Sequence, residues 1–443
     1  MSLSHLSPWL SAVFQRFAHW LDRRSAPRLP VLLLGILLAT GRRTATSWFR
    51  AAGIGHDFRN AYALLYSVGQ RKDSLAISAW TVVRPCLSGS RRLCVAIDDS
   101  PTKRYGPHIE GAGRHHNPTP GPAGEKFVYG HIWVTLAALA KHPDWGTIAL
   151  PLQASLYVRQ KNLSSIPPEY NWTFHTKLEL AATQLRWLKP WVSGQFEELW
   201  VVVDGGYFKK PFLSAARQEG FTVVGRLRKD AALWSLPSTT RRPGQRGPLP
   251  TYGKERFDLA KRAGQSRGWE QVECVQYGKR LIKTYKTFLA TYRPAGGLIR
   301  VVLVKEEHGW VAFGCTNPLA SVVDILEGAA DRGAEEQTFK DEKLIWGAGQ
   351  QQLRNVYANV GAFNLNLWMY STVESWAWEQ PAEALVDRSL SPWDTEPRRP
   401  SHADKRKALQ RQVLRQEIEG VLSETANPQR YRALTEKLLA LLP

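Results

Sequence analysis

The hydrophobic pattern of the chain changes character twice along its length. Residues 1–85 carry apolar stretches at 9–21 and 30–39, and arginines punctuate this helical region. Short apolar runs of strand length begin after residue 91, and helical periodicity returns at residue 320 and continues past residue 378. This order predicts an α/β protein with helices at both ends.

Between residues 93 and 227 the predicted elements alternate in kind. Residues 93–97 and 199–204 are short apolar strands, which end in Asp98-Asp99 and in Asp204. Residues 127–139 and 146–158 flank a turn and predict an antiparallel hairpin. Helices are expected at 174–188 and 211–218, with another strand at 221–227. This order is typical of a mixed α/β sheet.

The changes in pattern divide the chain into five segments. We expect an N-terminal helical domain at 1–88, which is either a DNA-binding module or a helical cap on the main domain. An α/β domain follows in two parts, 89–227 and 319–385. A β-rich insertion at 228–318 separates the parts, and 386–443 form a basic helical tail, which either contacts DNA or packs on a second subunit.

The charge balance narrows the class of partner. The 443 residues include 59 Lys and Arg against 39 Asp and Glu, a formal net charge of +20. So much positive charge favours a polyanionic partner, with nucleic acid ahead of an anionic membrane surface. The apolar run 31–39 is too short to span a bilayer and predicts a buried helix, so no membrane partner is expected. The four cysteines form no CxxC pair, which fits a cytoplasmic protein without a zinc or disulfide framework.

Carboxylates stand at the ends of two of the predicted strands. Asp98 or Asp99, Asp204, and one of Glu335 and Glu336 in a helical segment would together offer only oxygen ligands. Such a site suits Mg²⁺ or Mn²⁺, and two of these ions can promote in-line attack on a phosphodiester. The alternative is that the aspartates only cap turns.

The blocks around these acids resemble the DDE transposases of the IS4/IS701-type insertion-sequence group. VAIDDSPTKRYG resembles the group's first-strand motif, and VVVDGGYFKKPFL resembles the block around its second Asp. Arg332, Glu336 and Lys343 keep the intervals of the group's Y-x2-R-x3-E-x6-K pattern, with Ala329 at the Tyr position. The resemblance spans about residues 30–410 and implies an RNase H-like mixed sheet flanked by helices and interrupted by the β-rich insertion.

The resemblance also implies roles for single residues. Asp99, Asp204 and Glu336 would be the catalytic, metal-binding acids. Asp98 stays an alternative to Asp99 because the motif aligns either way, and Glu335 is the rival of Glu336. Arg332 and Lys343 would contact phosphates. Ala329 cannot make the phosphate contact expected of the Tyr, so Lys340 and Arg354 are candidates to replace it.

Further DNA contacts are expected outside the acidic motifs. Trp310 matches a Trp that stacks on a flipped base in hairpin-forming members of the group, and otherwise it is a core residue closing a strand. The basic tract from residue 226 to 267 is either a phosphate-tracking surface or a solvated loop. The predicted contacts from this tract and from the N-terminal helices are Arg226, Arg228, Arg241, Arg242, Arg42 and Arg43.

The resemblance predicts a bacterial cytoplasmic transposase that associates with the nucleoid when it is bound to DNA. It would cleave double-stranded DNA at element ends and join the freed 3′-hydroxyls to target DNA, using Mg²⁺ or Mn²⁺ and acting as a homodimer. Ala329 motivates a second hypothesis, an inactive or domesticated DNA-binding protein. A third is a nuclease of the same sheet type that never joins strands.

Overall fold

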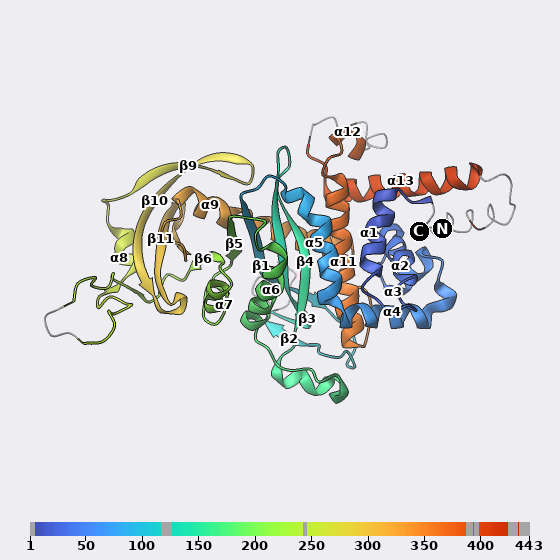
Figure 1. Ribbon diagram of the computed structural model, residues 1–443, viewed down its shortest axis with the longest axis horizontal. Helices are drawn as coiled ribbons and strands as arrows, with labels where there is room; N and C mark the ends of the chain where they lie inside the picture. Colours follow the sequence, from blue (N-terminus) through green and yellow to red (C-terminus); the bar gives the residue numbers. More distant parts are fainter. Residues whose placement is uncertain are drawn as a thin grey trace.

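The computed structural model describes residues 5–116, 126–241, 246–386, 393, 398–423 and 433. Within these residues, 13 α-helices flank one 12-stranded mixed sheet. Figure 1 shows an elongated molecule, with the N-terminal helices at one end and the β-rich strands at the other. The mixed α/β class expected from the sequence is confirmed.

Five helices precede the sheet. They are α1 (Pro8–Ala18), α2 (Arg28–Leu38), α3 (Ala45–Ala51), α4 (Phe58–Gln70) and α5 (Lys72–Val83). The apolar run at 31–39 lies in α2, which is buried on nearly all sides, as predicted. The side chain of Thr44 caps α3 by accepting a hydrogen bond from the Ser47 amide.

A long buried helix, α11 (Val356–Ala377), connects these helices to the sheet. It lies between the N-terminal helices and the sheet in Figure 1 and shares one hydrophobic cluster with α1 to α5. Helices α4 and α11 cross closely, because a Cβ atom at Gly361 would stand 2.1 Å from the Leu65 carbonyl oxygen. The N-terminal helices therefore pack firmly on the rest of the molecule.

The centre of the sheet is formed by β1 (Arg92–Lys103), β5 (Glu198–Val203) and β6 (Thr222–Leu227), which run parallel. On one side β1 pairs with β3 (Phe127–His142), which also pairs with β2 (Gly113–His116) and β4 (Gly146–Tyr157), all antiparallel. The predicted hairpin is thus confirmed as β3 and β4. Helix α6 (Lys177–Val192) leads from β4 into β5, and α7 (Phe212–Gln218) connects β5 to β6.

The β-rich segment extends the same sheet. Strand β12 (Gly309–Cys315) pairs antiparallel with β6, so the strands expected as an insertion continue the sheet without a break. This pairing satisfies the backbone groups of β6 that would otherwise form an open edge. The other elements here are β7 (Leu233–Trp234), β8 (Arg256–Phe257), α8 (Leu259–Gly264), β9 (Glu270–Gln276), β10 (Lys279–Tyr292) and β11 (Gly297–Glu306).

The chain then returns to helices. Helices α9 (Val322–Asp331) and α10 (Gly333–Leu344) meet at Arg332, within the segment that the sequence pattern predicted to be helical. Helices α12 (Ala382–Leu385) and α13 (His402–Ser423) follow α11. Short 3₁₀ helices are η2 (Gly55–Asp57), η3 (Arg84–Leu87), η4 (Gln160–Ser165), η5 (Pro168–Tyr170) and η6 (Arg293–Ala295). None of the helices in the described residues is long and apolar enough to cross a membrane.

A buried ionic cluster attaches α13 to α11. The Glu374 carboxylate accepts hydrogen bonds of 2.6 Å from both His402 Nδ1 and Lys405 Nζ, and Trp346 Nε1 donates to His402 Nε2. Burial alone would raise the pKa of Glu374, but the Lys405 ammonium and the His402 hydrogen bond lower this pKa to about 2. The ionised carboxylate therefore stabilises the folded state.

We expect Glu374→Gln to lower the free energy of unfolding by roughly 3 to 5 kcal/mol, because Lys405 would be left buried without a counter-ion. Because the folded pKa lies below the unfolded one, this contribution is present above about pH 4.5 and is lost as the pH falls towards about 2. Urea unfolding at neutral pH measures the change. The exposed Glu379→Gln control should stay within about 0.5 kcal/mol of the parent, and an equal effect of both variants would contradict the role of the cluster.

Candidate functional site

The parallel pairing of β1 and β5 places two of the predicted acids side by side. Ile97 is the partner of Val203 in the register, and Asp98 and Asp204 are the next residues of the two strands. Neighbouring positions of parallel strands point to the same face of a sheet. The register therefore groups Asp204 with Asp98.

The two aspartates of β1 point to opposite faces. Ala96 shares a hydrophobic cluster with Ile325 and Leu326 of α9, and Asp98 follows Ala96 by two residues. Ile97 belongs to the cluster that includes Leu185 of α6, and Asp99 lies on that side. The sequence favoured Asp99 as the first acid. The strand register favours Asp98, since it shares the face of Asp204 and of α9 and α10.

An arginine joins Asp98 to the start of α10. One guanidinium nitrogen of Arg332 donates to Asp98 Oδ2 at 2.7 Å, and another donates to Glu336 Oε1 at 2.8 Å. The second contact is the i, i+4 pair that the sequence spacing predicts. Glu336 is otherwise exposed, with 64% of its side chain accessible. Arg332 thus links the acids at 98 and 336.

Glu335 has the opposite environment. Its side chain is fully buried, and neither carboxylate oxygen has a hydrogen-bond partner among the described residues. Burial, together with the nearby charge of Asp98, raises the pKa of Glu335 well above its usual value. The protonated form of Glu335 is therefore favoured next to Asp98.

The charge of Asp99 is balanced by an ion pair on the other face of the sheet. Lys177 Nζ donates to Asp99 Oδ2 at 2.6 Å, and the buried Tyr207 hydroxyl donates to Asp99 Oδ1 at 3.0 Å. Lys177 is the first residue of α6, a position where the helix dipole disfavours a cation. The ion pair with Asp99 offsets that cost, so the two side chains stabilise each other.

Asp204 is fixed by the turn that follows β5. Its Oδ1 accepts hydrogen bonds from the amides of Gly206, at 2.7 Å, and Tyr207, at 3.2 Å. A Cβ atom at position 206 would stand only 2.9 Å from Asp204 Oδ1, so glycine allows this approach. No residue in the described part of the chain donates a hydrogen bond to Asp204 Oδ2, which leaves that oxygen available to a ligand.

The electrostatics at Asp98 reflect this crowding of acids. Burial raises the pKa of Asp98 to about 7, with the charges of Asp204 and Asp99 acting in the same direction and Arg332 acting against them. Asp98 therefore exchanges its proton near neutral pH, whereas an exposed aspartate loses it near pH 4.

The predicted DNA-contacting residues have several different environments. Trp310 is half-buried at the start of β12, and the Lys229 ammonium lies 5.1 Å from its ring centroid. Arg43 and Lys343 are partly buried, and burial lowers the pKa of each. Arg242 lies outside the described residues. The exposed members are Arg42, Arg226, Arg228, Arg241, Lys340 and Arg354.

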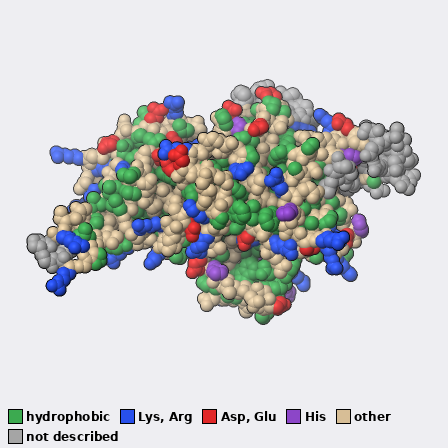
Figure 2. All heavy atoms as spheres, viewed as in Figure 1, with side chains coloured by type: hydrophobic (Ala, Val, Ile, Leu, Met, Phe, Trp, Pro, Cys, Tyr) green, Lys and Arg blue, Asp and Glu red, His purple; other side chains and the backbone are tan. Residues whose placement is uncertain are grey.

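Lys and Arg side chains are spread over the face seen in Figure 2, with acids among them, and several project from the end formed by the β-rich strands. Arg226 lies close to the acids, because its carbonyl oxygen is 3.0 Å from where a Cβ atom of Gly205 would stand. Arg228, by contrast, forms a two-pronged ion pair with Asp230.

The acidic face has the chemistry of a divalent-cation site, although its acids are not gathered into a preformed cluster. Among the described residues, no group of three or more His, Cys, Asp or Glu is arranged to hold a metal ion. Asp98, Asp204 and Glu336 supply only carboxylate oxygens, which Mg²⁺ and Mn²⁺ prefer, and the Arg332 guanidinium already brings a positive charge between two of them. The residues present therefore fit such an ion.

The sequence analysis did not predict two side chains that contact Asp99, those of Lys177 and Tyr207. A lysine inside the Thr176–Glu179 capping box was one available signal, because a cation in a first helical turn is stabilised by a nearby anion. Tyr207 had no comparable signal, since its role depends on the turn after β5.

Comparison with known families agrees with this geometry. A family model described as DDE superfamily endonuclease matches residues 13–285, which is more than half of the chain. The chain belongs to this family. A search of curated proteins gave no match. Membership points to a nuclease-type enzyme that acts on DNA, in a family whose enzymes generally depend on divalent metal ions.

The matched region of this DDE superfamily endonuclease includes Asp98, Asp99 and Asp204, together with most of the N-terminal helices. Helices α9 and α10 lie beyond its end. The choice between Glu335 and Glu336 therefore depends on the geometry of this chain and on the intervals of the resembling motif.

We expect Mn²⁺ to bind the protein about tenfold more tightly at about pH 8 than at about pH 6. A metal-binding carboxylate must be deprotonated, and with a pKa of about 7 Asp98 is mostly protonated at the lower pH and mostly ionised at the higher one. Electron paramagnetic resonance titration of free Mn²⁺ measures the affinities. Asp98→Asn should abolish the pH dependence, and equal affinities of the parent protein at both pH values would contradict this assignment.

Proposed function

We propose that the protein is a DNA transposase that cleaves the ends of an insertion sequence and joins them to target DNA. The observation that supports this most is the pairing of Asp98 with Asp204 on one face of the sheet, with Arg332 and Glu336 next to Asp98. Membership of the DDE superfamily endonucleases supports the DNA-cleaving half of the proposal.

Asp98, Asp204 and Glu336 are the proposed ligands of Mg²⁺ or Mn²⁺. Bound ions would activate the attacking hydroxyl or water and stabilise the leaving oxygen of the phosphodiester. Arg332 is proposed to leave its ion pairs with Asp98 and Glu336 and to contact a DNA phosphate, because its guanidinium suits two-pronged phosphate binding. Lys343, farther along α10, is the second proposed phosphate contact.

Asp99 has a different role in this proposal. It is a positioning residue that holds Lys177 at the start of α6 and accepts a hydrogen bond from the hydroxyl of Tyr207, the residue whose amide donates to Asp204. The wider features of the proposal, namely an RNase H-like domain, the IS4/IS701-type group and a homodimer on paired DNA ends, follow from the resemblance of the motifs.

One observation favours a nuclease that does not join strands. Ala329 occupies the position where the resembling group has a Tyr, and its small side chain packs against the hydrophobic cluster under α9. No hydroxyl is available there for a phosphate. A joining assay with pre-cleaved ends separates the two functions, because a nuclease of this kind releases cut ends without forming joined products.

We expect Asp98→Asn and Asp204→Asn to lower the rate of Mn²⁺-dependent cleavage of DNA that carries the element ends by at least about a hundredfold, since each removes a proposed metal ligand. Asp144→Asn, an exposed acid in the β3–β4 turn, is the matched control and should leave the rate unchanged. Gel analysis of end-labelled DNA gives the rates. Full activity in Asp98→Asn together with loss in Asp99→Asn would reverse the choice of first acid.

The third ligand is tested by a second pair of variants. Glu336→Gln should lower cleavage as strongly as Asp98→Asn. Glu335→Gln should preserve cleavage, because burial raises the pKa of this carboxyl and favours its neutral form, which the amide matches in charge and shape. Loss of cleavage confined to Glu335→Gln would transfer the ligand role to Glu335.

A further inference from the structure

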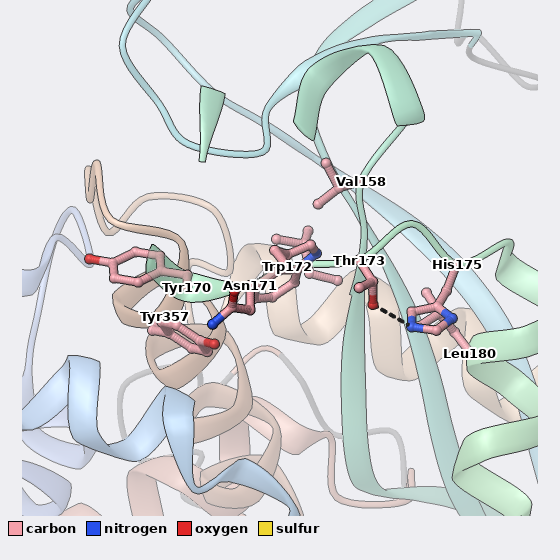
Figure 3. A pocket seen from close by; sticks show the side chains of 9 residues that line it. Val158, Tyr170, Asn171, Trp172, Thr173, His175, Leu180 and Tyr357 are labelled. Carbon is pink, nitrogen blue, oxygen red and sulfur yellow. Dashed lines mark hydrogen bonds between the residues drawn. The ribbon is translucent and has the colours of Figure 1, made fainter. Parts of the chain in front are cut away.

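A cavity with aromatic walls opens beside β4, at the edge of the sheet, next to the first turn of α6. Its volume is about 220 Å³, and it lies between the segment that leads into α6 and the first turn of α11. Figure 3 shows the rings of Tyr170 and Tyr357 together at one end, Trp172 in the middle and His175 at the other end. Buried Leu156 and Val158 of the β4 region complete the lining.

The aromatic side chains are held in place by one another. The ring centroids of Trp172 and Tyr357 are 5.5 Å apart, and those of Tyr170 and Tyr357 are 5.2 Å apart. The Tyr170 hydroxyl also accepts a hydrogen bond of 2.8 Å from Asn355. All three rings are only partly buried, so the cavity presents aromatic surface to an incoming ligand.

Polar groups stand at the rim of the same cavity. Thr173 Oγ1 and His175 Nε2 lie 3.0 Å apart, and both side chains are exposed. Asn171 is also exposed and has a φ of 50°, a left-handed conformation that costs free energy for a residue with a Cβ atom. The lining thus combines apolar ring surface with amide, hydroxyl and imidazole groups that can read the edge of a planar ligand.

The cavity adjoins the candidate site. His175 lines it, and Lys177, two residues later, donates to Asp99. Arg159 follows the lining residue Val158, and the exposed Arg354 precedes Tyr357 by three residues. Exposed acids also stand nearby, Glu169 in the adjoining 3₁₀ helix and Glu179 in the first turn of α6. The phosphates of a ligand would therefore be favoured on the part of the rim that carries Arg159 and Arg354.

We infer that this cavity binds one unpaired nucleobase of the DNA held at the candidate site. A base is planar, stacks on aromatic rings and presents hydrogen-bonding groups at its edge, and its backbone phosphates would meet the cations at the rim. The inference rests on the proposed function for the presence of DNA, but it requires neither bound metal nor cleavage.

Binding measurements in the absence of divalent metal test this inference. The probes are a fully paired duplex and the same duplex with a short single-stranded overhang that carries 2-aminopurine, a fluorescent base that is quenched when it stacks. The parent protein should prefer the overhang duplex and quench its fluorescence. Trp172→Ala should weaken binding of the overhang duplex by about tenfold or more, restore fluorescence and leave binding of the paired duplex unchanged.

Two further variants keep the test decisive. Trp191→Ala removes an exposed Trp near the other end of α6 and should leave binding of both duplexes unchanged. Asn171→Gly removes the rim amide while suiting the left-handed backbone, so it should fold at least as well as the parent. It should change the preference among the four bases in the overhang, and it carries the test if Trp172→Ala does not fold.

Equal affinities of the parent, Trp172→Ala and Asn171→Gly for the overhang duplex would overturn the inference. Metal-dependent cleavage by the parent protein would then still support the proposed function. Loss of cleavage in Asp98→Asn, with overhang binding intact, would show that the cavity and the acids act separately.

Discussion

The pairing of β1 with β5 is the constraint on which the candidate site depends. Parallel strands in this register bring Asp98 and Asp204 next to each other where the pairing of β1 with β5 ends, and there two negative charges repel and are costly to desolvate. Two cations, Arg332 and Lys177, and the backbone amides that donate to Asp204 offset this repulsion. The fold also leaves Asp98 with a pKa of about 7. Binding of a cation to the acids, or of a phosphate to the cations beside them, would therefore stabilise the site.

The two faces of β1 place different side chains around Asp98 and Asp99. On one face, α9 and α10 bring Arg332, Glu335 and Glu336 close to Asp98. A metal ion that binds Asp98 would therefore take the place of the Arg332 guanidinium or of a carboxyl proton. On the other face, Asp99 fixes Lys177 and with it the start of α6, beside the aromatic cavity. A DNA strand that passes Asp98 and Asp99 of β1 and continues towards the β4 edge of the sheet would therefore meet first the acids and then the aromatic rings.

Much of this arrangement was predictable from the sequence. The apolar runs before Asp98-Asp99 and Asp204 predicted the central strands, although β1 continues to Lys103, beyond the predicted end at Asp98-Asp99. The R-x3-E interval predicted the Arg332–Glu336 pair. The choice between adjacent acids was not predictable, because a strand buried on both faces has no alternation of polar and apolar residues to show which side chain faces which helix. That choice depends on the register of β1 against β5, which is a long-range property.

The continuity of the sheet also depends on a long-range strand pairing, so it was not predictable from the sequence. The strands between residues 228 and 318 were recognisable as strands, but their pattern did not show that β12 would pair with β6. The aromatic cavity escaped prediction because Tyr170, Trp172 and Tyr357 come from segments almost two hundred residues apart and meet only through the packing of α11.

The most direct test of the account is a crystal structure of the protein with Mn²⁺, in which anomalous scattering locates the metal. The account predicts a peak within coordination distance of Asp98 and Asp204, with the Arg332 side chain moved away from Asp98. A peak on the opposite face, coordinated by Asp99 in place of Lys177, would contradict it.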